Sequence, residues 1–195
     1  MATVPTTSEI KDFLRNEKPT EDDAFYSAAL DAAVQTMNDE CQHQFAVASA
    51  TATPRTFVPA YGSGRLFIGD CTTVTSVVEN GVTLTVSTNY HLEPVNTVNA
   101  AGLTVPYSSI RRRSSWWYTF DGTGTVVVTA TWGWTTIPVR VVEAIKILTK
   151  DIIENRDARG GLLTFGDQGL ASSRPNSYVN QTIAMYRGER SWGIG

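Results

Sequence analysis

Histidine is the commonest general base and metal ligand in proteins, so the two histidines of this chain are tested first for chemistry. His43 and His91 are the only histidines among 195 residues. Neither stands with a cysteine or a carboxylate at a metal-ligand spacing such as H-x-x-x-H or C-x-x-C. We therefore expect no metal site and no cofactor.

Nucleophilic and glycosidic chemistry also find little support. A serine nucleophile would need one of the two histidines as its base, and Gly62-Ser63-Gly64 is too short to be a G-x-S-x-G elbow. The carboxylates that could form a glycosidase pair lie where helix caps or a solvated helix face explain them: Asp22, Asp23, Asp39 and Glu40. The sequence predicts no catalytic residues and a protein that is not an enzyme.

A run of arginines and aromatic residues resembles a nucleic-acid surface. Arg111, Arg112 and Arg113 precede Trp116-Trp117-Tyr118, which combines cations for phosphates with rings for stacking. Since strand residues alternate between two faces, the structural interpretation turns one or two arginines to solvent or an acidic neighbour and one tryptophan into the core. The formal net charge of -3 favours the structural interpretation. The three arginines remain the candidate DNA contacts of an alternative function, a nucleic-acid-binding β module.

Two further tryptophans, Trp132 and Trp134, could line a sugar site of a carbohydrate-binding or hydrolytic module. Their spacing of two residues just before a helix favours packing. With Pro138 they are the predicted seam between β residues and helix.

The composition limits the number of domains, the location of the protein and the state of its cysteines. A chain with 42% hydrophobic and 18% charged residues forms one large domain or two small ones. The first residues lack a signal-peptide pattern, and no apolar run approaches the roughly 20 residues that cross a bilayer, so we expect the chain to be made and kept in a cytoplasm. Cys41 and Cys71 are expected to be reduced thiols.

Helices are predicted at both ends of the chain. Thr6 and Glu9 form a capping box, and Ser177 is expected to cap a last helix. Pro138 suits the first turn of a helix, and an apolar stripe follows it at helical spacing: Val141, Ala144, Ile145, Leu148 and Ile152. We expect this helix to pack on the stripe of the second helix, Tyr26 to Cys41. The predicted helices cover residues 7–15, about 20–44, 138–159 and a short stretch from 177.

Between the helices, residues 46–134 are rich in Thr, Val and Gly. About seven short strands are expected, and Asn80-Gly81 suits a tight hairpin turn. The predicted strands lie within 55–58, 65–68, 74–79, 82–87, 90–93, 106–111, 116–120 and 125–132, with a second turn at 121–124. Such a set is typical of a small sandwich or barrel.

The predicted fold class is α+β. We expect a helical bundle of about three main helices plus a short C-terminal helix, carrying an inserted antiparallel β sandwich or barrel-like module. The helical domain would comprise residues 1–45 and 135–159, the β module 46–134, and an extended tail with a short helix 160–195.

Several segments together resemble a known family. They are the capped helices Ser8–Leu14 and Asp22–Phe45, the strand entry Pro54-Arg55-Thr56-Phe57, the hairpin region Val74–Tyr90 and the segment Val128–Arg156. Trp132-Gly133-Trp134, Ile137-Pro138 and the closing Tyr186-Arg187 are similar to its junction motifs. The pattern resembles the head-to-tail connector (adaptor) family of long-tailed bacteriophages, in the form with a β insertion.

The resemblance implies a structural virion protein at the head-tail interface. It implies a ring, commonly of twelve subunits, that lies beneath the portal and prolongs the DNA channel towards the tail. The implied partners are further copies of the chain, the portal protein, a tail-side neck or tail-completion protein, and packaged DNA that passes without sequence readout; no membrane is implied.

The tail from Gly160 onward is expected to reach a neighbouring subunit or the portal. Amphipathic helices with more apolar surface than one small bundle hides would suit head-to-tail packing between neighbours. The candidate inter-subunit or portal contacts are Leu162, Leu163, Phe165, Leu170, Tyr178, Ile183, Tyr186, Arg187 and Trp192.

Overall fold

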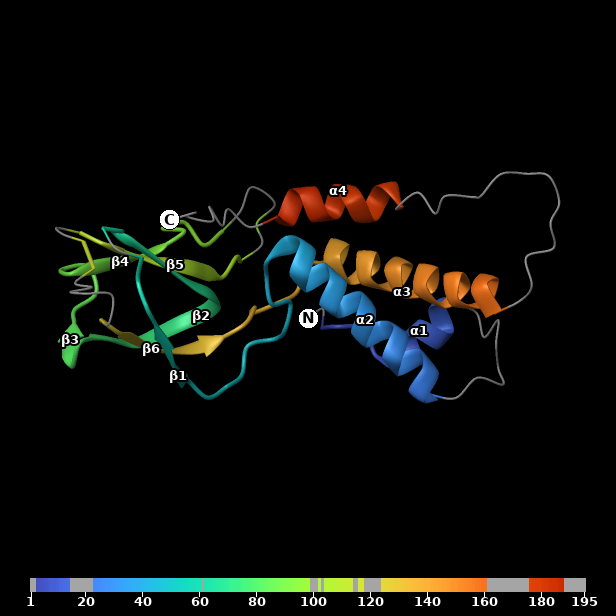
Figure 1. The fold of residues 1–195 in the computed structure, drawn as a ribbon, viewed down its shortest axis with the longest axis horizontal. Helices are drawn as coiled ribbons and strands as arrows, with labels where there is room; N and C mark the ends of the chain where they lie inside the picture. Colours follow the sequence, from blue (N-terminus) through green and yellow to red (C-terminus); the bar gives the residue numbers. More distant parts are fainter. Residues whose placement is uncertain are drawn as a thin grey trace. The chain divides into compact units, whose positions relative to one another are not determined.

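The computed structural model divides the chain into two compact units (Figure 1). The helical unit lies within Met1–His43 and Ile137–Gly188, and the β unit lies within Gln44–Thr136. The residues that the structure describes are 3–14, 23–60, 62–98, 102, 104–113, 116–117, 124–160 and 176–187, with the backbone alone for 155–160.

The helical unit contains α1 (Thr7–Phe13), α2 (Asp23–Cys41), α3 (Val139–Gly160) and α4 (Ser177–Tyr186). The predicted capping box at the start of α1 is confirmed. Thr6 Oγ1 accepts a hydrogen bond from Glu9 N at 3.3 Å, and the Glu9 carboxylate accepts one from Thr6 N at 2.7 Å. Both exchanges satisfy backbone donors that the first helical turn leaves without partners.

The helix that follows Pro138 packs against α2, as the apolar stripes predicted. The two helices contribute the buried residues Tyr26, Leu30, Ala33, Met37, Val141, Ala144, Ile145 and Ile153. Near the end of α3 the buried positions lie one residue later than predicted. Thr149 and Ile153 are buried there, while the predicted Leu148 and Ile152 are half-buried. The Thr149 hydroxyl is satisfied inside its own helix, where it donates to Ile145 O at 2.8 Å.

Helix α4 begins one residue earlier than predicted in its capping. Asn176, rather than Ser177, is the N-cap, and its side-chain oxygen accepts from Tyr178 N at 2.9 Å. Val179 and Thr182 are buried. Arg140 of α3 donates to the Thr182 hydroxyl at 3.1 Å, which ties α4 to the helix it packs on.

The β unit is built on one six-stranded antiparallel sheet. Its strands are β1 (Thr53–Phe57), β2 (Arg65–Glu79), β3 (Val82–Leu84), β4 (Tyr90–Glu93), β5 (Tyr107–Arg112) and β6 (Val126–Trp132). The order across the sheet is β1-β6-β2-β5-β4, and β3 pairs with β2. Alternate residues of β6 are buried and contribute Val126, Val128, Ala130 and Trp132 to one apolar core.

Strand β2 holds the sheet together because it is 15 residues long. Its first part pairs with β5, its last residues pair with β3, and β6 pairs along Cys71 to Glu79. The pairing with β5 shifts register between Phe67 and Cys71, where Gly69 has a φ of 83°. A glycine at positive φ within a paired strand is typical of a β-bulge, which bends a strand without ending it.

The predicted fold class was wrong in its architecture, although the chain is α+β. Among the described residues α1 has 7 residues and α4 has 10, so only α2 and α3 are long and there is no bundle of three main helices. The strands form a single sheet in place of a sandwich or barrel. The separate strands predicted at 65–68 and 74–79 are one strand, because the bulge at Gly69 continues the pairing.

The predicted hairpin turn at Asn80-Gly81 is confirmed. Asn80 has a φ of 47° and Gly81 a φ of 82°, which is the geometry of a tight turn between β2 and β3. The Asn80 side-chain oxygen also accepts from Thr125 N at 3.0 Å. The strand predicted over 116–120 is absent at Trp116 and Trp117, and its other residues and the turn at 121–123 lie outside the described residues.

Both cysteines are buried free thiols, one in each unit. Burial raises the pKa of Cys41 to about 11 and that of Cys71 to about 12, from an ordinary value of 9.0. The folded state therefore holds the neutral thiol in a pH range where the unfolded chain ionises. Thiolate chemistry is suppressed at both positions near neutral pH.

This burial predicts a loss of stability in alkali. As the pH rises above 9, the unfolded state is stabilised because its thiols ionise, whereas the folded state keeps its thiols protonated until about pH 11. Urea unfolding should show a free energy of unfolding that falls between these values, and Cys71→Ala should reduce that slope. Equal slopes for the parent and the variant would contradict the prediction.

Candidate functional site

The three arginines predicted as DNA contacts point to different surroundings. The Arg112 guanidinium donates to the Glu79 carboxylate, and both side chains are buried, with 7% and 6% of their surfaces exposed. Arg113 donates to the backbone oxygen of Ser87. Arg111 faces outward, with 58% of its side chain exposed, and Arg113 is exposed as well. The strand therefore does not present three arginines together on one surface.

The adjacent tryptophans also differ in burial. Trp117 is 2% exposed and belongs to the core of the β unit, and the Arg112 guanidinium lies 5.4 Å from its ring centroid. Trp116 is 65% exposed. The structural interpretation of this run, with one arginine on an acidic neighbour and one tryptophan in the core, is confirmed.

Arg111 belongs to a row of basic residues that crosses three strands. Arg65 of β2 and His91 of β4 are its direct partners in the register of β5. Glu93 lies beside them: it accepts a hydrogen bond from Arg65, and its carboxylate is 3.6 Å from Arg111 Nη1 and 3.7 Å from His91 Nε2. Burial alone would raise the pKa of Glu93, but hydrogen bonding and attraction from Arg65, followed by Ser109 and Arg111, lower it below 4.5. Glu93 is therefore ionised at neutral pH and offsets part of the row's charge.

A surface hollow lies against two of these arginines. We call it the Arg-Trp hollow, and it is lined by Gly62, Ser63, Gly64, Arg65, Arg111 and Trp116. Its volume is about 470 Å³. Arg111 and Trp116 belong to one run in the sequence, whereas Arg65 and the turn at Gly62 were not predicted as members of a site, because strand pairing is what places them beside that run.

The predicted seam tryptophans are buried, at 8% exposed for Trp132 and 2% for Trp134. The Trp132 indole donates to Thr53 O at 2.9 Å, and the Trp134 indole donates to the Asp70 carboxylate at 3.0 Å. Both bonds lie within the β unit, so these rings do not line an open sugar site. Pro138 is buried directly before α3, and its backbone oxygen accepts from Val141 N at 2.9 Å.

Four of the candidate inter-subunit or portal contacts lie on or beside α4. Tyr178, Ile183 and Tyr186 are half-buried, and Arg140 lies 5.0 Å from the Tyr178 ring centroid. Arg187 is exposed and forms an ion pair with Glu40 of α2 at 3.2 Å. The remaining candidates lie outside the described residues: Leu162, Leu163, Phe165, Leu170 and Trp192.

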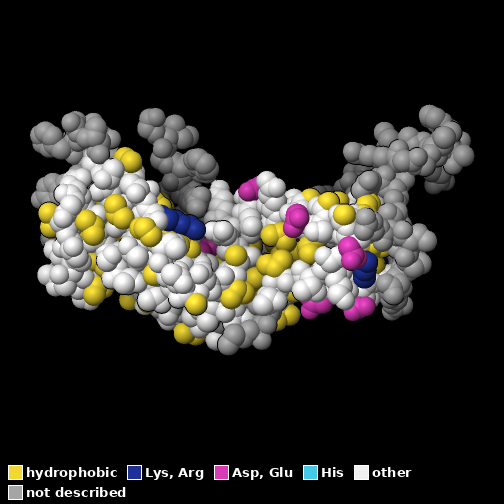
Figure 2. Space-filling view, turned by 90° about the horizontal axis from the view of Figure 1, so that it is seen from below, with side chains coloured by type: hydrophobic (Ala, Val, Ile, Leu, Met, Phe, Trp, Pro, Cys, Tyr) yellow, Lys and Arg dark blue, Asp and Glu magenta, His cyan; other side chains and the backbone are white. Residues whose placement is uncertain are grey.

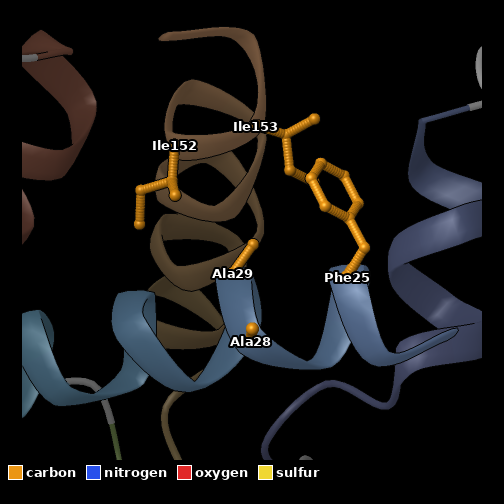
Figure 3. A pocket seen from close by; sticks show the side chains of 5 residues that line it. All are labelled: Phe25, Ala28, Ala29, Ile152 and Ile153. Carbon is orange, nitrogen blue, oxygen red and sulfur yellow. The ribbon is translucent and has the colours of Figure 1, made fainter. Parts of the chain in front are cut away.

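An apolar groove between α2 and α3 was not predicted (Figure 3). Phe25, Ala28 and Ala29 of α2 face Ile152 and Ile153 of α3 around a volume of about 150 Å³. Figure 3 shows the Phe25 ring reaching towards Ile153, with the two small alanines forming the floor. Because Ile153 rather than Ile152 is fully buried near the end of α3, Ile152 stays half-buried and lines the groove.

The surface around the helices is mixed in character. Figure 2 shows apolar side chains exposed among acidic ones on the face of the helical unit that it views. Large apolar side chains with substantial exposure in this unit include Phe13, Val139 and Met185. Exposed apolar surface rimmed by polar groups is typical of protein contact sites.

Among the described residues, no group of three or more His, Cys, Asp or Glu side chains is placed to hold a metal ion. No helix there is long and apolar enough to cross a membrane.

The comparisons with known proteins identify similar folds and no similar sequences. No family model matches, and no curated protein matches. The chain is similar to a chain in the neck of an empty GTA (gene transfer agent) particle, computed with C6 symmetry, at a TM-score of 0.58 and 19% identity. It is also similar to one in the neck of a native GTA particle, computed with C12 symmetry, at a TM-score of 0.52 and 17% identity. Both matches cover 99% of this chain and 96% of the other.

These matches show the fold. They confirm the resemblance noted in the sequence, because the similar structures are necks of phage-like particles. The coverage extends over the helical elements and the β unit together.

Proposed function

We propose that this chain is a structural, non-enzymatic protein of the neck of a phage-like particle. The observation that supports the proposal most is the match of fold over nearly the full length of both chains with neck structures. A short shared motif could arise on unrelated proteins, whereas the same order of helices and sheet across a whole chain is a stronger basis for analogy.

The finer part of the proposal concerns assembly. The chain would form a ring of twelve copies that joins the portal to the tail and prolongs the DNA channel. The symmetries used for the similar neck structures, C6 and C12, are compatible with twelve copies. A ring requires a head-to-tail interface, in which two different surfaces of each copy meet. The tail from 160 to 195 would reach a neighbouring copy or the portal, and the particle would be assembled in a host cytoplasm.

The α2/α3 groove is our candidate for one of the two surfaces. It is lined only by carbon side chains, and its volume suits a single apolar side chain of a neighbouring copy. The opposite surface would include the α4 candidates Tyr178, Ile183, Tyr186 and Arg187. A heterologous contact of this kind repeats around a closed ring without leaving the groove exposed.

The assembly is tested by native mass spectrometry and negative-stain electron microscopy of the purified protein, alone and mixed with portal protein. Rings in either sample, with a mass that is a multiple of 21.3 kDa close to twelve copies, would support the proposal. Monomers in both samples would contradict it.

The groove is tested by Ala28→Glu. Ala28 is exposed, so the variant should keep the parent's melting temperature, but a carboxylate in the groove would have to be buried on association and should prevent ring formation. Thr36→Glu is the matched control, because Thr36 is an exposed residue of the same helix that does not line the groove. If Ala28→Glu forms rings that resist dilution as well as those of Thr36→Glu, the groove is not part of the interface between copies.

A further inference from the structure

The Arg-Trp hollow combines three features that the proposed neck function does not use. It has a fixed shape, because Trp117 N donates to Ser63 O at 3.1 Å and Arg112 N donates to Gly64 O at 2.8 Å. The Ser63 hydroxyl further secures the turn, since it donates to Arg65 O at 2.6 Å and accepts from Arg65 N at 3.1 Å. The turn therefore lies against β5 and the Trp116-Trp117 segment through backbone bonds.

The second feature is an excess of positive charge. Arg65 and Arg111 are direct cross-strand partners, an arrangement in which like charges repel. One carboxylate, that of Glu93, accepts a hydrogen bond from Arg65 and forms an ion pair with Arg111 at 3.6 Å; the Glu93 side chain is 12% exposed, while the arginine side chains are 41% and 58% exposed. Two guanidinium groups thus share one carboxylate and remain substantially exposed to solvent, and guanidinium binds phosphate oxygens well.

The third feature is the exposed indole of Trp116 on the wall of the same hollow. Its neighbour Trp117 fills the core, so the packing of this segment does not require a second ring. An exposed aromatic face beside cations is the arrangement that binds unpaired nucleic-acid bases by stacking. A volume of about 470 Å³ also falls in the range of small-ligand sites, roughly 300–1,000 Å³.

We propose that the Arg-Trp hollow binds single-stranded nucleic acid, with a phosphate group held by Arg65 and Arg111 and the adjoining base stacked on Trp116. A duplex does not fit this site, because its bases are already stacked and paired. The site is independent of ring formation, since all its residues lie in the β unit of one copy.

The experiment is fluorescence polarisation of a labelled oligothymidylate with the full-length protein, over a series of salt concentrations. Trp116→Ala should weaken binding by about 10- to 100-fold, since stacking on one aromatic ring contributes about 1–3 kcal/mol per base. Arg111→Ser should reduce the slope of log K against log salt by about 0.7 for one lost phosphate contact. Trp116→Phe should keep most of the affinity, because it retains an aromatic face.

Arg55→Ser is the matched control. Arg55 is an exposed arginine of the same unit whose guanidinium lies 4.3 Å from the Trp132 ring centroid, and it does not line the hollow. It should leave the Trp116-dependent part of binding unchanged. Melting temperatures of all variants establish that they fold.

Three results would overturn the proposal. The first is the absence of binding by the parent at low salt. The second is a duplex that binds as tightly as the single strand and is insensitive to Trp116→Ala. The third is an oligoglutamate peptide that displaces the strand at equal charge concentration and loses affinity in Trp116→Ala, which would assign the hollow to an acidic protein segment. A failure of any of these kinds leaves ring formation by the same protein intact, so the two proposals are separable.

Discussion

Glu79→Gln should lower the free energy of unfolding by about 3–5 kcal/mol, the range measured when one partner of a buried ion pair is removed. Glu79 and Arg112 are both buried, and the carboxylate accepts from the guanidinium. The substitution preserves the volume of the side chain but removes the negative charge that faces the Arg112 guanidinium in the core. Urea unfolding monitored by circular dichroism measures the loss.

The double variant Glu79→Leu with Arg112→Met should be more stable than Glu79→Gln, because it removes both charges from the core. The exposed pair Lys150–Glu154, one helical turn apart on α3 at 3.5 Å, supplies the control. Glu154→Gln should cost at most about 0.5 kcal/mol, as is usual for exposed pairs at this spacing. Similar losses for Glu79→Gln and Glu154→Gln would show that burial of the Arg112 pair does not matter.

Gly133→Ala should have a comparable effect, about 3–5 kcal/mol, through the backbone. Gly133 has a φ of 117°, where an L residue is strained by about 1–3 kcal/mol. A Cβ at this position would lie 2.6 Å from Ala46 O and 3.0 Å from Ala48 N. Those atoms bond the Trp134 backbone at 2.8 Å each, so moving them apart also weakens two hydrogen bonds of about 1 kcal/mol each.

Gly81→Ala separates strain from crowding. Gly81 also has a positive φ, of 82°, but no atom lies within 4 Å of the added Cβ. It should cost about 1–2 kcal/mol, the strain of a left-handed residue alone. Thermal unfolding measures the difference in stability between the two variants. Equal melting temperatures would show that the close contact of Gly133 with Ala46 adds no cost to the alanine substitution.

Sequence analysis predicted the elements whose chemistry is complete within a few residues. The capping box of Thr6 and Glu9 and the turn at Asn80-Gly81 need no distant partner, and both are in place. The helix after Pro138 was predicted for the same reason, because its start signal and its stripe are local.

The errors arise where a distant partner decides the outcome. The strands predicted at 65–68 and 74–79 left Gly69-Asp70 between them, yet Asp70 is buried and accepts from Gln44 N at 2.9 Å and from the Trp134 indole. These partners lie 26 and 64 residues away, so a window of ten residues contains no trace of them. The strand therefore continues through residues that were predicted to lie between two separate strands.

The candidate sites also depend on partners that are distant in the sequence. The run Arg111 to Trp116 was visible in the sequence, but the burial of Arg112 depends on Glu79, which lies 33 residues away. The α2/α3 groove joins Phe25 to Ile153 and depends on how the two helices pack, which a stripe of apolar residues does not specify.

The bonds between Ala46, Ala48 and Trp134 have a consequence for how such a chain evolves. They place the entry and the exit of the β unit side by side, with Trp134 N bonded to Ala46 O and Ala48 N bonded to Trp134 O, both at 2.8 Å. Because the two crossing points are adjacent, gain, loss or exchange of everything between them changes the loop-closure entropy of the remaining chain little. In genetic terms the β unit has the topology of a cassette, which recombination could replace as one piece.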